Sequence, residues 1–284
     1  MADVQILTLS CTDKAGITAR VTGYLFELGC NVLEAQQFND QDEGTFFMRV
    51  EFDPGAADVG QIRDGFAPLA KAHGMRWTLN SKGKLRKTVL MVSKFDHCLA
   101  DLLYRVRIGE LPMDVVGIIC NHPREALVHT NIRDVPFHYL PITKDTKPQQ
   151  EAEVKRVVEE SGAELIVLAR YMQILSDDLA AFLSGRCINI HHSFLPGFKG
   201  AKPYHQAHAR GVKMIGATAH YVTADLDEGP IIHQDVEAIT HSDRPDDLVR
   251  KGRDIERRVL AEAVRLHLGD RVLVNGEKTV VFRG

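Results

Sequence analysis

The sequence is poor in cysteine and carries almost no excess of charge of either sign. Its five cysteines are scattered and odd in number, and none forms a C-x-x-C pair. This spacing argues against a disulfide framework or a thiolate zinc site, and it predicts buried free thiols in a reducing compartment. The 35 Lys and Arg residues against 38 Asp and Glu residues give a net charge of -3. A basic nucleic-acid coat and a self-repelling acidic chain are both excluded, so we expect no nucleic-acid partner.

Long apolar runs are also missing. The longest, at residues 115–120 and 165–169, suit buried strands and are far too short to span a bilayer. No basic segment precedes the short apolar run at residues 6–9, so no secretory signal is predicted. We therefore expect a cytoplasmic protein without a membrane partner. The 284 residues, 44% of them hydrophobic, correspond to about two globular domains.

Residues 1–81 alternate strands and helices. Strands are predicted over residues 5–10, 31–38, 48–52 and 75–79, and amphipathic helices over residues 17–28 and 59–69. Thr12 and Asp13 offer a cap for the first helix, and Gly29 is placed to end it. In the third strand the apolar residues alternate with Arg49 and Glu51, which is typical of a strand with one buried face. The order β-α-β-β-α-β predicts a ferredoxin-like fold.

A change of pattern follows the polar, basic segment 82–87, which we interpret as a linker. The second domain is predicted to span residues 88–284. Its apolar strands are expected at 89–92, 115–120, 137–140, 165–169 and 187–191, with helices that include 98–107 and 149–161. Such alternation predicts a Rossmann-like α/β domain whose mostly parallel sheet is covered on both faces. Because ligands bind beyond the carboxyl ends of such strands, the chemistry is expected after residues 169 and 191.

Several nucleotide and nucleophile motifs are absent. The sequence has no G-x-x-x-x-G-K-[ST] run, no G-x-G-x-x-G after the first strand of the second domain, and no G-x-S-x-G. A nucleotide-dependent kinase or dehydrogenase and an α/β-hydrolase are therefore disfavoured. The loop after that first strand, residues 93–98, offers no glycine cradle for a phosphate.

The predicted second domain carries an amide, an imidazole and a carboxylate on segments that the fold could bring together. Asn189 and His191 are two residues apart in a strand and so project from the same face. The acidic loop 225–230, which includes Asp227, follows another strand. An amide N–H can stabilise an oxyanion, a histidine can protonate a leaving nitrogen, and a carboxylate can orient or deprotonate water. This combination suits attack on a carbonyl-type carbon.

Two other interpretations remain open at this point. A buried Asn–His pair also fits an ordinary hydrogen-bond network, and an acidic turn fits a loop cap. Six histidines also gather in this part of the sequence, namely His191, His192, His205, His208, His220 and His233. With a carboxylate they could hold a divalent metal in an amide hydrolase, although the H-E-x-x-H spacing is missing.

These motifs resemble the 10-formyltetrahydrofolate-using formyltransferase family. The resemblance rests on Asn-Ile-His at 189–191, Ser-x-Leu-Pro at 193–196, Leu-Asp-x-Gly-Pro at 226–230 and Leu-Ala-Arg-Tyr-Met-Gln-Ile-Leu at 168–175. It implies that Asn189, His191 and Asp227 are the catalytic residues and that no metal or cofactor is needed, since the folate is a substrate. It further implies a folate pocket made by Arg170, Met172, Gln173, Ile174, Leu175, Ala224 and Asp225. His220 and Ser193 are then expected to support the catalytic residues.

The amino-terminal segment resembles an ACT domain, on the run 7–17 and on Cys-Asn-Val at 30–32. That resemblance implies a regulatory module with a small-molecule effector, such as an amino acid, near Asp13, Gly16 and Asn31. It also implies a homo-oligomer, either a dimer or a tetramer.

An ACT module joined to a formyltransferase-like domain resembles the hydrolytic branch of the family, in which water is the acceptor. The expected reaction is hydrolysis of 10-formyltetrahydrofolate to formate and tetrahydrofolate, which would supply formate for purine biosynthesis and balance the one-carbon folate pool. Formyl transfer to an amine and metal-dependent amide hydrolysis are the alternatives.

Overall fold

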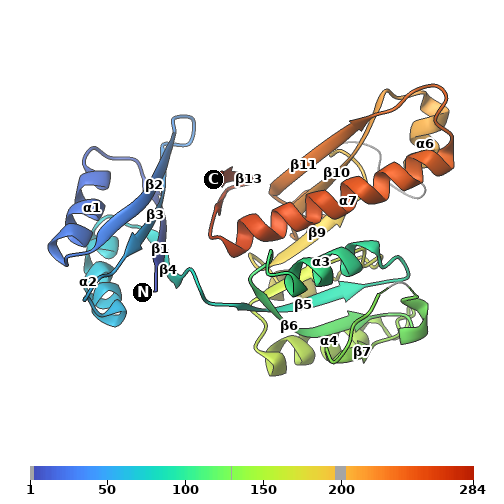
Figure 1. Cartoon of the computed structure of the whole chain (residues 1–284), viewed down its shortest axis with the longest axis horizontal. Helices are drawn as coiled ribbons and strands as arrows, with labels where there is room; N and C mark the ends of the chain where they lie inside the picture. The colour runs from blue at the N-terminus through green and yellow to red at the C-terminus, as the bar shows by residue number, and fades with distance from the viewer. Residues whose placement is uncertain (1–2, 129, 196–202) are drawn as a thin grey trace. The chain divides into compact units, whose positions relative to one another are not determined.

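The computed structural model of the chain describes residues 3–128, 130–195 and 203–284. It divides into two compact units (Figure 1). The first unit holds the chain up to Lys84 together with Gly269–Asn275 and Thr279–Gly284, and the second holds Leu85–Leu268 and Gly276–Lys278. The division falls inside the predicted linker 82–87. The prediction that the second domain runs on to residue 284 is wrong, because most residues after 268 group with the first unit.

The first unit has the predicted β-α-β-β-α-β order. Its elements are β1 (Gln5–Thr12), α1 (Ile17–Glu27), β2 (Asn31–Asp40), β3 (Thr45–Asp53), α2 (Val59–Ala72) and β4 (Arg76–Ser81). The antiparallel sheet has the strand order β2-β3-β1-β4, and both helices lie on one of its faces (Figure 1). The first helix begins after Gly16, whose φ is 89°, and not at a Thr12 or Asp13 cap as predicted. Gly29, at φ 75°, follows its end as expected.

Strand β3 is buried on both faces, whereas the sequence predicted one. Arg49 is 1% exposed and Glu51 is 6% exposed. These charges tolerate burial because they are paired: Arg49 lies 3.1 Å from a carboxylate oxygen of both Glu34 and Glu51, and its guanidinium donates to the Gly269 carbonyl. The segment after residue 268 therefore completes the environment of this strand, which no local alternation could reveal.

The second unit is a layered α/β domain. Its elements up to β8 are β5 (Arg86–Val92), α3 (His97–Arg107), β6 (Met113–Cys120), the short 3-10 helix Arg124–Ala126, β7 (Phe137–Tyr139), α4 (Lys147–Ser161) and β8 (Leu165–Leu168). There follow α5 (Asp177–Phe182), β9 (Cys187–His191), α6 (Pro203–Arg210), β10 (Met214–Tyr221), β11 (Ile231–Ala238) and α7 (Pro245–Leu268). The two-stranded hairpin β12 (Val272–Asn275) and β13 (Lys278–Val281) comes next in the chain and belongs mostly to the first unit.

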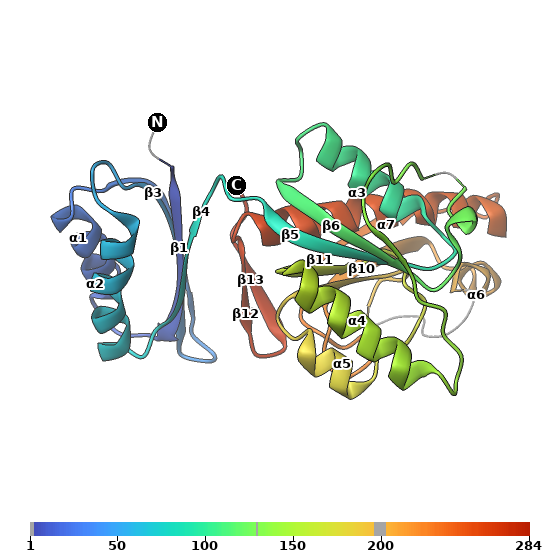
Figure 2. The same ribbon diagram turned by 90° about the horizontal axis from the view of Figure 1, so that it is seen from below.

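The seven-stranded sheet of this unit has the order β11-β10-β9-β8-β5-β6-β7. It is parallel from β9 to β7, and β10 and β11 are antiparallel, which confirms a mostly parallel sheet. Helices α3 and α7 lie on one face and α4 and α5 on the other (Figure 2). The carboxyl ends of β5, β6, β8 and β9 therefore share one edge, where side chains that follow these strands can converge.

The state of the cysteines and the character of the helices can be compared with what the composition predicted. All five cysteines are free and buried, as predicted. In the part of the chain that the structure describes, no helix combines the length and apolar character needed to cross a membrane.

Candidate active site

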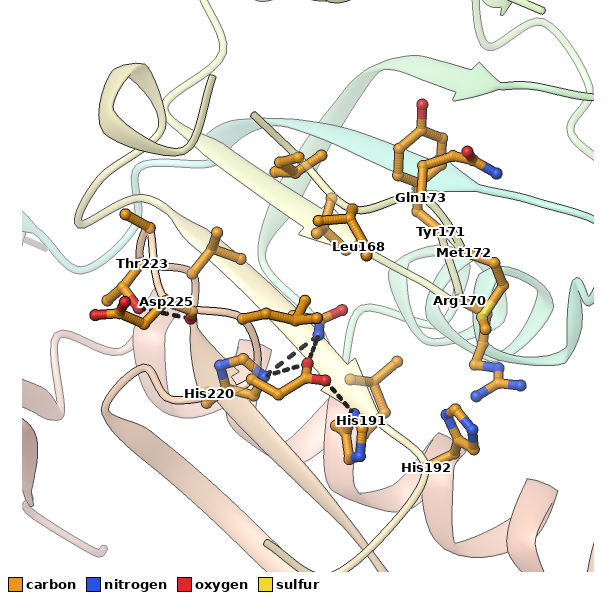
Figure 3. Close-up of a pocket in the computed structure, with 18 residues that line it drawn as sticks. Leu168, Arg170, Tyr171, Met172, Gln173, His191, His192, His220, Thr223 and Asp225 are labelled. Atoms are coloured by element: carbon orange, nitrogen blue, oxygen red, sulfur yellow. Dashed lines mark hydrogen bonds and ion pairs between the residues drawn. The ribbon is translucent and has the colours of Figure 1, made fainter. Parts of the chain in front are cut away.

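A cavity of about 270 Å³ opens at the carboxyl edge of β8 and β9. Three segments line it: residues 168 and 170–175 at the end of β8 and in the loop after it, residues 189–192 at the end of β9, and residues 220 and 222–227 at the end of β10 and in the loop after it (Figure 3). All ten residues that the sequence assigned to catalysis or to the folate pocket lie on this wall, and so does His220.

The carboxylate of Asp227 lies at the centre of a small polar group. His191 Nδ1 is 3.1 Å from Asp227 Oδ2, Asn189 Nδ2 is 3.5 Å from Asp227 Oδ1, and His220 Nε2 is 3.7 Å from the same Oδ1 (Figure 3). The structure thus brings together the amide, the imidazole and the carboxylate that the sequence selected. Their roles in a reaction stay predictions.

The pairing of β9 with β10 explains this convergence. Asn189 and His191 share one face of β9, and the antiparallel register places His220 opposite Asn189. The His220 Nδ1–H donates to the Tyr221 carbonyl at 2.9 Å, and its Nε2 lies 3.3 Å from the Asn189 amide nitrogen and 3.7 Å from Asp227 Oδ1. The contact with Asn189 fixes the amide orientation. The longer N–H contact to Asp227 is the one that an incoming oxygen can take over.

Backbone geometry presents the carboxylate. Asp227 has φ 58°, a left-handed conformation that costs a non-glycine residue about 1–3 kcal/mol. Three residues later the loop closes on β10, because Tyr221 N donates to the Pro230 carbonyl at 2.9 Å. A Cβ at Gly229 would lie 1.7 Å from the Tyr221 carbonyl oxygen, so only glycine fits there. The Leu-Asp-x-Gly-Pro run is therefore a tight return that holds Asp227 over the cavity.

Two opposing effects set the charge of Asp227. Burial alone would raise its pKa, but hydrogen bonds from His191 and His220, together with their charges, hold the pKa well below its usual range. Asp227 is therefore ionised at neutral pH, which suits it to orient water and to stabilise an imidazolium.

Residues far away in the sequence hold the loop that follows β8. Ser93 Oγ accepts from the Met172 N–H at 2.9 Å, and the Ser93 N–H donates to the Arg170 carbonyl at 3.1 Å. Gln150 donates to the Tyr171 hydroxyl at 2.9 Å. The loop leaves the side chains of Met172 and Ile174 49% and 62% exposed, so Ile174 is no core residue. Single-sequence patterns gave no signal for Ser93 or Gln150.

One predicted supporting residue lies outside the cavity wall. Ser193 is buried, and its carbonyl accepts from Thr218 Oγ1 at 3.0 Å. Thr218 also accepts from the Leu195 N–H at 3.0 Å and from Gln234 at 2.8 Å. Ser193 thus belongs to the link between β9 and β10, and Thr218 and Gln234 were missed by the sequence reasoning. Pro196, which completes the Ser-x-Leu-Pro run, lies outside the described residues.

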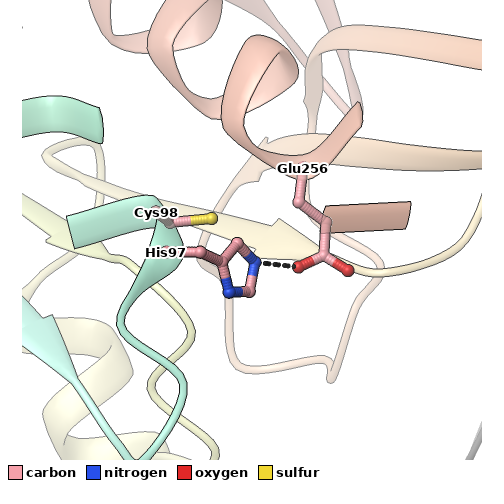
Figure 4. A group of neighbouring side chains, drawn as sticks. All are labelled: His97, Cys98 and Glu256. Carbon is pink, nitrogen blue, oxygen red and sulfur yellow. Dashed lines mark hydrogen bonds and ion pairs between the residues drawn. The ribbon is translucent and has the colours of Figure 1, made fainter. Parts of the chain in front are cut away.

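The histidine-rich region does not assemble as a ligand set. Within residues 3–128, 130–195 and 203–284, one group of three potential ligands has all its atoms within 4.8 Å of one another, and it consists of His97, Cys98 and Glu256 (Figure 4). None of the six histidines considered for a metal site belongs to it.

The residues proposed for an effector site are also not gathered within one chain. Asp13 and Gly16 follow β1, whose last residue, Thr12, pairs with Thr45 of β3. Asn31 begins β2 and pairs with Asp53, at the other end of β3. Eight residues of extended strand, at about 3.3 Å each, separate these ends. One small ligand cannot contact Asp13 and Asn31 of the same chain.

Comparison with known proteins agrees with this geometry. The formyl transferase family model matches residues 86–264, and the ACT domain model matches residues 5–63. A formyltetrahydrofolate deformylase of Corynebacterium sp. (strain P-1) is 50% identical over 98% of both chains. The chain belongs to the formyltetrahydrofolate deformylase family. It is therefore an enzyme with an ACT domain and a formyltransferase domain.

Solved structures support the same assignment. The crystal structure of a formyltetrahydrofolate deformylase from Burkholderia mallei is 52% identical and superposes with a TM-score of 0.93, covering 99% of this chain and 100% of that one. Glycinamide ribonucleotide transformylase 1 from Symbiobacterium toebii is 28% identical, has a TM-score of 0.63, and covers 70% of this chain and 95% of that one. The full-length match is thus to the deformylases.

Proposed function

We propose that this chain hydrolyses 10-formyltetrahydrofolate to formate and tetrahydrofolate. The observation that carries the proposal is the meeting of Asn189, His191 and the ionised Asp227 on the wall of one cavity, in a chain of the deformylase family. The three groups supply an oxyanion donor, a proton carrier and a water-orienting carboxylate, which is what hydrolysis of a formamide requires.

In the proposed mechanism, Asp227 holds a water molecule against the formyl carbon. A C–O bond forms as the water loses a proton, and the Asn189 N–H stabilises the negative oxygen. Because the pKa of Asp227 is held low, the proton passes to Nε2 of His191, whose Nδ1–H donates to Asp227 at 3.1 Å and whose Nε2 has no other hydrogen-bond partner among the described residues. The C–N bond then breaks as the folate nitrogen takes that proton from His191, and the formic acid ionises to formate. The step uses no metal or cofactor.

The folate is expected to bind along the loop after β8. The exposed side chains of Met172 and Ile174, with Leu175, form an apolar wall for the flat pterin ring. Gln173 and backbone groups of Arg170, Ala224 and Asp225 would hydrogen-bond its polar edge. The backbone at Arg170 and Met172 is fixed by Ser93, so these groups are positioned before the substrate arrives.

The ACT domain is expected to regulate this reaction. We propose an amino-acid effector at the loop that holds Asp13 and Gly16, and a homo-oligomer in which Asn31 of a neighbouring chain could complete the site. The enzyme would act in the cytoplasm, supply formate for purine biosynthesis and balance the one-carbon folate pool. Its partners are small molecules, with no nucleic acid or membrane among them.

The test uses the pure protein with 10-formyltetrahydrofolate, a chelator and no acceptor amine. We expect one formate and one tetrahydrofolate for each substrate consumed. The exposed Asp246→Asn serves as a control for variants of Asp227, since Asp246 lies in the first turn of α7. Absence of formate would overturn the proposal. Activity restored by an added amine would then indicate a transferase, and activity restored by a divalent metal would indicate a metal hydrolase.

A further inference from the structure

A second buried carboxylate lies behind the wall of the cavity. Glu256, in α7, is 1% exposed. Its Oε2 accepts from His97 Nε2 at 2.7 Å (Figure 4), and its Oε1 accepts from the Tyr204 hydroxyl at 2.7 Å. Both oxygens therefore already have short hydrogen bonds.

Arg170 lies beside Glu256, and the hydrogen bonds of its guanidinium are only partly satisfied. Its Nε lies 3.4 Å from Glu256 Oε2, so the charges are paired, but the oxygen is already taken by His97. The residue is only 9% exposed, and its Nε and Nη1 are buried without a hydrogen-bond partner among the described residues. A buried guanidinium with open donors is built to receive an acceptor that the protein does not supply.

The open guanidinium belongs to the wall of the catalytic cavity. Arg170 lines that cavity together with His192, and Figure 3 shows its side chain running from the loop after β8 toward His192. The His191 and His192 rings are 5.2 Å apart between centroids. The backbone of Arg170 is left-handed, with φ 67°, and the guanidinium lies 5.8 Å from the centroid of the Phe95 ring. A strained backbone that aims a cation at a cavity favours a functional role.

The positive charge of Arg170 decides whether a cation or an anion would bind beside it. His97, Cys98 and Glu256 would suit a metal by distance, but His97 and Glu256 already bond to each other and a guanidinium lies beside them. Burial also raises the pKa of the Cys98 thiol well above its usual value, so no thiolate is offered. A cation is repelled there, whereas a small anion finds free N–H donors.

We propose that Arg170 binds a small monocarboxylate at this wall, namely the formate that hydrolysis releases, and that Glu256 is the residue that positions Arg170. The inference rests on the proposed function, because formate is the anion which that reaction generates from an uncharged formyl group. The planar guanidinium matches the two oxygens of a carboxylate. Formate then leaves the catalytic carboxylate Asp227 for a cation on the same wall.

A glycine in the middle of α7, Gly252, leaves the space that the Tyr204 ring occupies. A Cβ on Gly252 of α7 would lie 2.1 Å from Tyr204 Cζ, so alanine there would displace the ring that donates to Glu256. Glycine inside a helix is otherwise unfavourable relative to alanine. The helix thus has glycine, a residue of low helix propensity, at the position where the Tyr204 ring that bonds to Glu256 needs space.

The experiment measures sodium formate binding to the whole protein by the line width of ¹³C-formate, without folate. The variants are Arg170→Gln and Glu256→Gln, with Arg170→Lys as a charge-keeping variant. The control is Arg253→Gln, an exposed residue of the same helix as Glu256. We expect the formate dissociation constant to rise at least tenfold in Arg170→Gln, about threefold to tenfold in Glu256→Gln, and less than twofold in Arg253→Gln.

Formate binding that is unchanged in both Arg170→Gln and Arg170→Lys would overturn the inference, and so would equal displacement of formate by chloride. Circular dichroism identifies a variant that fails to fold, in which case Arg170→Lys decides through its loss of the bidentate contact. Because no folate is present, the result is independent of turnover: Arg170-dependent formate binding in a protein that releases no formate would support the anion site and reject the proposed reaction.

Discussion

Asp227 and Glu256 are both carboxylates that contact a histidine, and their surroundings differ. Asp227 is carried by a loop in a left-handed conformation, and its side chain is 16% exposed toward a cavity. Glu256 is carried by a helix, is 1% exposed, and has both oxygens occupied at 2.7 Å. A carboxylate that handles water needs access and a free lone pair, whereas one that holds a cation in place needs saturation. The difference in access is what separates the two tasks.

The largest effect is expected for Asp227→Asn. The amide keeps the shape but cannot stabilise an imidazolium, so turnover should fall about 10³-fold or more while folate binding changes little. Initial rates of formate release and folate titration by fluorescence would measure both. A mutant with wild-type turnover would remove Asp227 from the mechanism.

Asn189→Ala tests whether the neighbour of Asp227 is chemical or structural. Loss of an oxyanion donor costs about 10²–10³ in turnover. The matched measurement is thermal unfolding, because a purely structural asparagine would change stability and leave turnover within tenfold. We expect Asn189→Ala to lower turnover more than tenfold and to change thermal stability little.

Glu256→Gln should mainly lower stability, whereas Asn189→Ala should mainly lower turnover. The change leaves the buried Arg170 without a counter-charge and His97 without its carboxylate partner, which typically costs about 3 kcal/mol or more of stability. We expect turnover to fall about tenfold, less than in Asp227→Asn. Urea unfolding with parallel rate measurements would show it, and a stability unchanged from wild type would contradict the ion pairing described.

The smallest effect concerns acid sensitivity. Burial raises the pKa of Asp227 and of Glu256, but hydrogen bonds from neighbouring histidines outweigh it, so both pKa values lie below their usual range. The stability that these two carboxylates contribute is therefore present above about pH 4 and is lost only as the pH falls further. Two histidines behave differently. Burial, with Arg170 nearby, lowers the pKa of His192 to about 4, and burial with Arg86 nearby lowers that of His267 to about 4.

For these histidines the unfolded chain binds more protons between pH 6.5 and 4, so stability should fall as the pH drops through that range. His267→Gln should remove part of the slope, about 3 kcal/mol at most. Thermal melts at several pH values would measure the effect, with the exposed His241→Gln as control. An identical slope in His267→Gln would show that His267 is accessible to protons in the folded protein.

Local sequence patterns predicted most of the strands, and together with the resemblance to the formyltransferases they selected Asn189, His191 and Asp227, whose catalytic roles stay predictions. Alternation along β9 placed Asn189 and His191 on one face, and the turn residues around Gly229 located Asp227. Contacts between distant segments were not predictable in this way. Nothing near Arg170 in the sequence indicates that Glu256 lies beside it. Likewise, nothing near Arg49 indicates that the Gly269 carbonyl covers β3. Both depend on how complete elements pack.

The cover supplied by residues after 268 has a consequence for the order of events during synthesis. Arg49 lies in β3, yet its carbonyl partner Gly269 is made 220 residues later, and so, just after it, is Arg271, which pairs with Glu34. A nascent chain therefore carries an unfinished first sheet, in which Arg49 can pair with Glu34 and Glu51 but lacks the Gly269 carbonyl, until the ribosome has passed residue 269. Although domains usually mature from the amino terminus onward, this first unit is completed only after the second has been made.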